Sequence, residues 1–77
     1  MALITDAALT WSPPITLTAD EIWQARKGSI FVTTTVTPDA QDGIALHENH
    51  AVQVPAGTSV SYRKEGNTEA LIVHEAL

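Results

Sequence analysis

Ile30-Phe31-Val32-Thr33-Thr34-Thr35-Val36 is the stretch that decides the fold class of this 77-residue chain. Its residues are all β-branched or aromatic, and such side chains favour a pleated strand. The threonines add polar groups, as expected for a sheet with one face toward water. The stretch therefore predicts a β-strand in a half-solvated sheet.

Further short strands are predicted on both sides of this run, separated by clusters of turn-forming residues such as 37–43. Residues 21–26 could instead form a capped helical turn before the turn at 27–29. The predicted strands cover residues 15–18, 21–26, 30–36, 44–47, 51–54, 59–63 and 70–74. Strands at intervals of about ten residues indicate an all-β fold, either a small antiparallel β-sandwich or a jelly-roll-like barrel.

The core and the domain boundary follow from the same patterns. Alternation and the apolar final strand predict that five side chains point inward: Val54, Val60, Tyr62, Leu71 and Val73. Residues 15–77 are expected to form a single β domain. Residues 1–14 are expected to be an N-terminal arm, because their apolar spacing is helical while the prolines at 13 and 14 stop any helix. The alternative is a terminal strand or helix packed on its own domain.

The size of the chain indicates association with other chains. A core in so short a chain seldom contributes more than about 3–5 kcal/mol, and small domains usually add disulfides, a metal or partner chains. The chain has no cysteine, which excludes disulfides and thiolate zinc sites. An apolar arm is costly to expose, so Leu3, Ile4, Leu9 and Trp11 are expected at an interface. Trp23 is expected there as well, because large aromatic residues commonly anchor an interface, with a place in the core as the alternative.

Charge and hydropathy limit the classes of partner. The net charge of −5, with four lysines and arginines in total, disfavours direct binding to nucleic acid. No apolar run approaches the about 18 residues of a membrane helix, and no export signal is recognised, so no membrane partner is expected.

Neither a metal site nor a catalytic site is predicted. His47, His50 and His74 are possible ligands, but the spacing of the first two does not match the helical zinc motif. The loop around Asp39 and Asp42 lacks the downstream glutamate of a calcium loop. No serine lies in a G-x-S-x-G elbow, and so small a core leaves little room for a deep pocket. The chain is expected to be no enzyme and to use no cofactor.

One local resemblance concerns residues 52–62, where Val52-Gln53-Val54-Pro55-Ala56-Gly57 leads into a strand. This resembles the turn of the second cupin motif, which implies a jelly-roll-like hairpin. Ser59, Val60 and Ser61 stand where that motif carries its metal-binding histidine, so the resemblance does not extend to metal chemistry.

A broader resemblance extends over most of the chain, through Glu21-Ile22-Trp23-Gln24, Gly28, Gly43-Ile44-Ala45-Leu46, Pro55-Ala56-Gly57 and Tyr62-Arg63. In these segments the chain resembles small accessory virion proteins of tailed phages and gene transfer agents. The resemblance implies a virion location after assembly in the host cytoplasm, a trimer or pentamer, and contact with capsid proteins as a head decoration, spike base or connector. Two alternatives stay open: a cupin-like small-molecule or carbohydrate-binding module, and a regulatory β domain that binds another protein through a sheet edge.

Overall fold

The computed structural model describes residues 2–77, which form eight β-strands and no helix. Seven of the strands lie at the predicted places, and the region 21–26 is a strand and not a helical turn. Two of them end at least two residues earlier than predicted, at Thr16 and at Thr33, so residues 34–36 belong to the following loop. The additional strand is the short β1 near the N-terminus. The strands are β1 (Ala2–Ile4), β2 (Ile15–Thr16), β3 (Glu21–Lys27), β4 (Ile30–Thr33), β5 (Ile44–Leu46), β6 (Ala51–Val54), β7 (Ser59–Lys64) and β8 (Leu71–Ala76).

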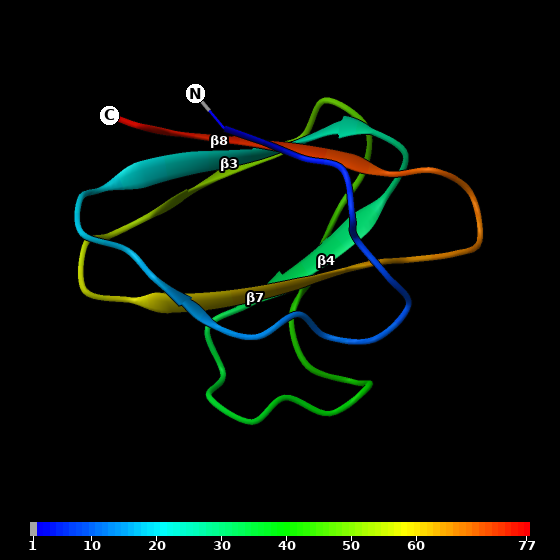
Figure 1. Ribbon diagram of the computed structural model, residues 1–77, viewed down its shortest axis with the longest axis horizontal. Coiled ribbons are helices and arrows are strands. Elements are labelled where there is room, and N and C mark those ends of the chain that lie inside the picture. Colours follow the sequence, from blue (N-terminus) through cyan, green and yellow to red (C-terminus); the bar gives the residue numbers. More distant parts are fainter. Residues whose placement is uncertain (1) are drawn as a thin grey trace.

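The strands form two four-stranded antiparallel sheets that pack face to face (Figure 1). The first sheet has the order β1-β8-β3-β6 and the second has the order β2-β7-β4-β5. Within them, β1 pairs with β8, β2 with β7, β3 with β6 and β4 with β5. This is the pairing of one long hairpin folded over on itself, which is jelly-roll topology. The fold class is therefore confirmed as a small β-sandwich.

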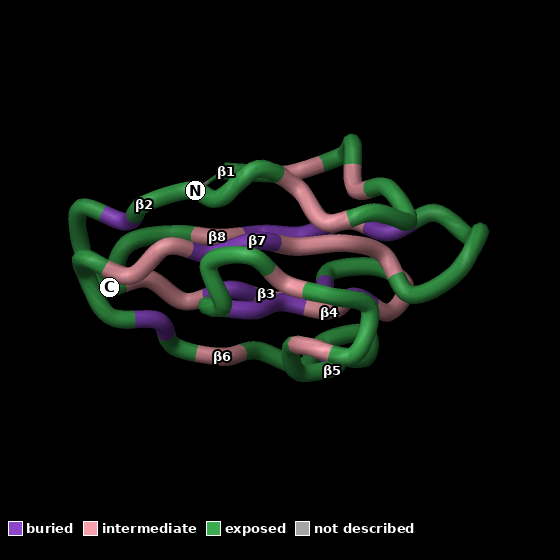
Figure 2. Tube along the Cα trace, turned by 90° about the horizontal axis from the view of Figure 1, so that it is seen from below, coloured by how far each residue is buried: buried purple, intermediate pink, exposed green. Residues whose placement is uncertain are grey.

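The lateral order of the strands gives the molecule two open sides. Figure 2 shows β1 and β2 along one side and β5 and β6 along the opposite side, with the other strands between them. Viewed down the shortest axis, each open side is one of the two broadest faces of the molecule (Figure 1). The edges of both sheets therefore meet solvent on two broad faces.

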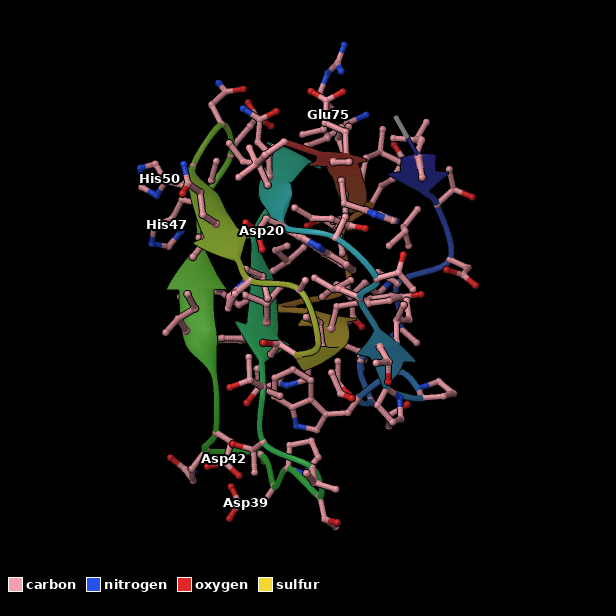
Figure 3. All side chains as sticks on the ribbon, turned by 90° about the vertical axis from the view of Figure 1, so that its left-hand side faces the viewer. Asp20, Asp39, Asp42, His47, His50 and Glu75 are labelled. Carbon is pink, nitrogen blue, oxygen red and sulfur yellow. The ribbon has the colours of Figure 1, made fainter. Side chains whose placement is uncertain are left out.

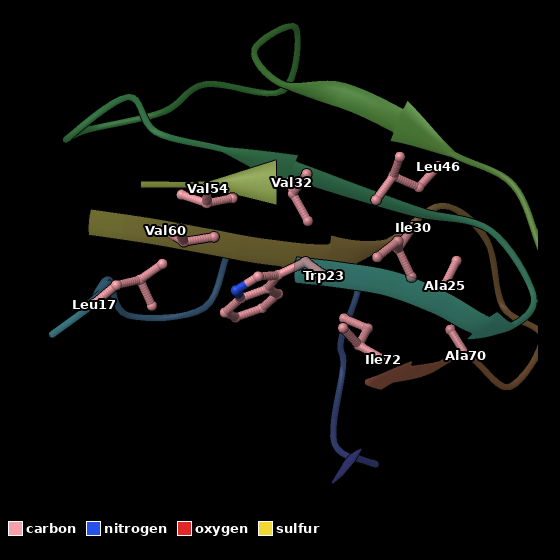
Figure 4. Packing of buried hydrophobic residues seen from close by; sticks show 10 residues of the cluster. All are labelled: Leu17, Trp23, Ala25, Ile30, Val32, Leu46, Val54, Val60, Ala70 and Ile72. Carbon is pink, nitrogen blue, oxygen red and sulfur yellow. The ribbon is translucent and has the colours of Figure 1, made fainter. Parts of the chain in front are cut away.

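The core lies between the two sheets and is centred on Trp23, which is 0% exposed (Figure 4). The indole ring stacks on the imidazole of His74, with the ring centroids 4.4 Å apart. The remaining members of the core are small or aliphatic: Leu17, Ala25, Ile30, Val32, Leu46, Val54, Val60, Ala70 and Ile72. The core thus includes Val54 and Val60 as predicted, with Tyr62 partly buried against it.

The predicted orientation of the last strand is wrong. In β8, Ile72 is fully buried in the core, and it lies opposite Ala25, another core residue. Because side chains alternate along a strand, Leu71 and Val73 belong to the outer face of the sheet. Val73 is nevertheless buried there, between Leu3 on one neighbouring strand and Gln24 on the other.

The N-terminal segment is hydrogen-bonded to the same sandwich. β1 forms the outer strand of the first sheet beside β8. Farther along, the Ser12 amide donates to the Tyr62 carbonyl, and the Tyr62 amide donates to Ser12 Oγ. The Lys64 amide donates to the Ala8 carbonyl. Residues 2–14 therefore form strand β1 and a segment that crosses one open side to reach β2.

Candidate functional site

An apolar groove opens between the edge strands β5 and β6. It has a volume of about 310 Å³ and lies near the ends of these two strands that are farther from the turn joining them. We call it the edge groove. Its lining residues are Val32, Thr33, Thr34, Gly43, Ile44, Val52, Gln53, Val54, Pro55 and Val60.

The chemistry of the edge groove is that of an apolar binding site. Val32, Val54 and Val60 are buried core residues, so the groove reaches the interior of the sandwich. Ile44 is 50% exposed at its rim. None of the ten lining residues is titratable, and none is aromatic. The groove can therefore receive aliphatic groups, and its polar side chains are those of Thr33, Thr34 and Gln53.

The opposite open side carries exposed apolar side chains. We call this side, formed by residues 2–16, the N-terminal side. Leu9 is 48% exposed, Leu3 is 49% exposed and Ile15 is 37% exposed. Ile4 is partly buried and packs against the core. Of the residues expected at an interface, Leu3 and Leu9 thus present apolar surface, whereas Ile4 packs mainly against the core of its own domain.

Trp11 is held within the chain by a cluster on the outer face of the second sheet. Its indole N–H donates to the carbonyl of Asp39 at 2.8 Å. The Arg63 guanidinium lies 5.1 Å from the Trp11 ring centroid and 4.2 Å from that of Phe31. Arg63 also donates through Nη2 to the carbonyl of Ala40 at 3.1 Å. We call Trp11, Phe31 and Arg63 the clasp, because they fasten the N-terminal segment and the loop 34–43 to the sheet.

Trp23 lies in the core and not at the surface, so it offers no side-chain area to a partner. Its indole N–H donates to Glu21 Oε1 at 3.1 Å. The same carboxylate oxygen lies 2.8 Å from His74 Nδ1. Glu21 and His74 are both largely buried; Glu21 satisfies the polar atom that Trp23 brings into the core, and His74 pairs with the same carboxylate oxygen. This cluster has a structural explanation that requires no ligand.

The three histidines do not converge. His47 and His50 lie on the turn between β5 and β6, with ring centroids 5.6 Å apart, whereas His74 is stacked on Trp23. Figure 3 shows the first two projecting together, away from the labelled carboxylates Asp39 and Asp42. Among residues 2–77, no group of three or more histidine, aspartate, glutamate or cysteine side chains is placed to hold a metal. The same part of the chain has no helix long and apolar enough to cross a bilayer.

Sequence reasoning missed the edge groove. Its residues come from separate strands and appear in the sequence as ordinary alternating positions, so nothing marks them as a site. One available signal is charge. The edge strands β1, β2, β5 and β6 contain no charged residue, although the chain has nine acidic and four basic residues.

Comparison of the chain with protein-family models, with curated proteins and with solved structures finds no match.

Proposed function

We propose that this chain is a non-enzymatic structural component of a phage-like particle, which assembles as a homo-oligomer and docks on the capsid. The observation that carries the proposal is the pair of open sides. Each open side is bordered by uncharged edge strands, and one of them contains an apolar groove without titratable groups. Monomeric β proteins usually protect sheet edges with charges, prolines, bulges or very short edge strands, and of these devices the four edge strands here have only their shortness. Edges left uncharged on broad faces support a role in assembly.

The acidic character of the chain is compatible with this role. The net charge of −5 keeps the free subunit soluble and resists non-specific aggregation. The edge strands themselves contain no charged residue, although the exposed Asp6 lies on the N-terminal side between β1 and β2. Assembly through specific contacts and solubility before assembly can therefore coexist in one small domain.

One observation favours a second candidate, the binding of a small apolar molecule. The groove volume of about 310 Å³ is near the lower end of the range of small-molecule sites, about 300–1,000 Å³. A sugar fits less well, because the groove lacks the aromatic surface on which sugar rings usually stack. Titration with a short-chain alkane probe, monitored by tryptophan fluorescence and by the heat of binding, would distinguish this candidate from assembly.

The test of the proposed function is an add-back experiment. Purified protein is mixed with particles from a strain that lacks the gene, the particles are sedimented, and the bound copies are counted. We expect saturable binding at a fixed number of copies per particle, and a concentration-dependent native mass for the free protein. The Ile72→Ala variant, whose core is disrupted, serves as the control and should not bind. A protein that stays monomeric at high concentration and never sediments with particles would rule out the proposal.

A further inference from the structure

The two open sides of the molecule have the size of a standard protein interface. The molecule measures 31 × 25 Å along its two longer axes, so a contact that covers one broad face approaches the about 800 Å² per partner that stable specific complexes bury. A contact that covers one such face is therefore large enough to hold two copies together.

The shapes and chemistry of the two sides complement each other. The groove side is hollowed by the edge groove, which is apolar and open. The N-terminal side presents Leu9 and Ile15 as exposed apolar side chains. Filling an apolar hollow with aliphatic side chains removes both from water and restores the packing density of a protein interior.

A two-fold contact between identical sides cannot both fill the edge groove and cover Leu9 and Ile15. Groove against groove would enclose two empty apolar hollows, which is unfavourable because their linings lose dispersion contacts. It would also leave Leu9 and Ile15 of both copies in water. Contact between unlike sides fills the groove and covers these side chains in one step.

The positions of the edge strands are compatible with contact between unlike sides. β6 is the free edge of the first sheet on the groove side, and β1 is its free edge on the N-terminal side. When unlike sides meet, β6 of one copy faces β1 of the next, and neither strand contains a charge or a proline. The second sheet is less able to continue, because Pro13 and Pro14 directly precede β2 and lack backbone donors.

We propose that the edge groove of one copy receives Leu9 and Ile15 of the next copy, so that subunits join head to tail through unlike sides. This inference rests on the self-assembly in the proposed function and specifies its contact. A head-to-tail contact closes into a ring when the rotation between subunits allows it, and otherwise continues as a filament. The groove is then incomplete in a single chain and is filled only in the assembly.

The test uses one substitution on each side. Ile44→Glu places a carboxylate at the groove rim, and Leu9→Glu places one on the opposite side. Both positions are about half exposed, so each variant should fold, which circular dichroism checks. Val36→Glu is the matched control, because Val36 is 79% exposed, does not line the edge groove and does not belong to residues 2–16. Each single variant should associate roughly 100-fold more weakly than wild type, since a buried unpaired carboxylate is strongly disfavoured.

The decisive measurement is the mixture of the two variants in sedimentation velocity over a concentration series. Ile44→Glu protein keeps an intact N-terminal side and Leu9→Glu protein keeps an intact groove, so the mixture should form dimers and nothing larger. Wild type and the Val36→Glu control should form larger assemblies. If Ile44→Glu does not fold, Ile44→Ser replaces it at the same position.

Three results would overturn the inference. In the first, the wild type assembles but Leu9→Glu assembles equally well. In the second, the mixture stays monomeric while wild type assembles. Both remove the head-to-tail contact while leaving self-assembly and particle binding intact. In the third, wild type is monomeric at every concentration, which removes the contact and the assembly part of the proposed function together.

Discussion

The register of β8 gives a sharp prediction from two neighbouring residues. Ile72 is fully buried in the core, whereas Leu71 is half-buried on the outer face of the same strand. Replacing a fully buried isoleucine with alanine costs about 2–5 kcal/mol, because transfer energy is lost and a cavity remains. A chain of this length has a free energy of unfolding of only about 4–12 kcal/mol, at about 0.05–0.15 kcal/mol per residue. Ile72→Ala therefore removes a large part of the stability.

Leu71→Ala should cost about 1 kcal/mol, because the side chain lies outside the core and its loss leaves no enclosed cavity. Urea unfolding followed by tryptophan fluorescence measures both variants, since Trp23 lies at the centre of the core. We expect a large shift of the midpoint for Ile72→Ala and a small one for Leu71→Ala. A larger loss of unfolding free energy for Leu71→Ala than for Ile72→Ala would show that β8 turns its other face toward the core.

Three further predictions concern the clasp, a turn and pH. Trp11→Phe keeps an aromatic ring but removes the N–H that donates to the Asp39 carbonyl; it should destabilise by about 0.5–1.5 kcal/mol and increase amide exchange in residues 37–43. Gly43→Ala should destabilise at least about 1 kcal/mol more than Gly57→Ala in thermal unfolding. Both glycines have positive φ, but a Cβ on Gly43 would lie 2.8 Å from a backbone oxygen and 2.9 Å from the Trp11 ring, whereas Gly57 has nothing within 4 Å. Burial, and then the Asp6 carboxylate, raises the pKa of Tyr62 above its ordinary value of 10.0. The folded state therefore keeps the phenol protonated, and its contribution to stability is complete below pH 10.0 and is lost as the pH rises through the folded pKa; urea midpoints measured in this range should fall less for Tyr62→Phe than for wild type.

Strand positions could be predicted from the sequence because alternation and turn residues are local signals. The loop 37–43 and the turn at Pro55–Gly57 lie where the sequence places them. The turn does not form a hairpin, however, since β6 and β7 belong to different sheets. Whether a turn joins neighbours in one sheet or crosses between two sheets depends on long-range pairing, which local sequence does not encode.

The orientation of β8 could not be predicted, because residues 70–73 are all apolar and provide no alternation from which to choose a face. The role of Trp23 was missed for a related reason. A tryptophan at an interface and a tryptophan in a core look alike in sequence. Glu21 lies beside Trp23 on the same strand, but only the pairing of β3 with β8 brings His74 to its side. The edge groove likewise exists only after the two sheets have packed.

The place of β8 between β1 and β3 has a consequence for the order in which this protein forms. β8 is the last strand in sequence, yet β1 and β3 obtain their shared neighbour only when it arrives. During synthesis, at about 5–20 residues per second, these earlier strands remain without their central partner until residues 71–76 have emerged. Pairing across such sequence distances is slow compared with local pairing. A chain cut short before residue 71 therefore lacks the strand that joins β1 to the rest of the first sheet, and it should be removed by cellular proteolysis and not accumulate as folded protein.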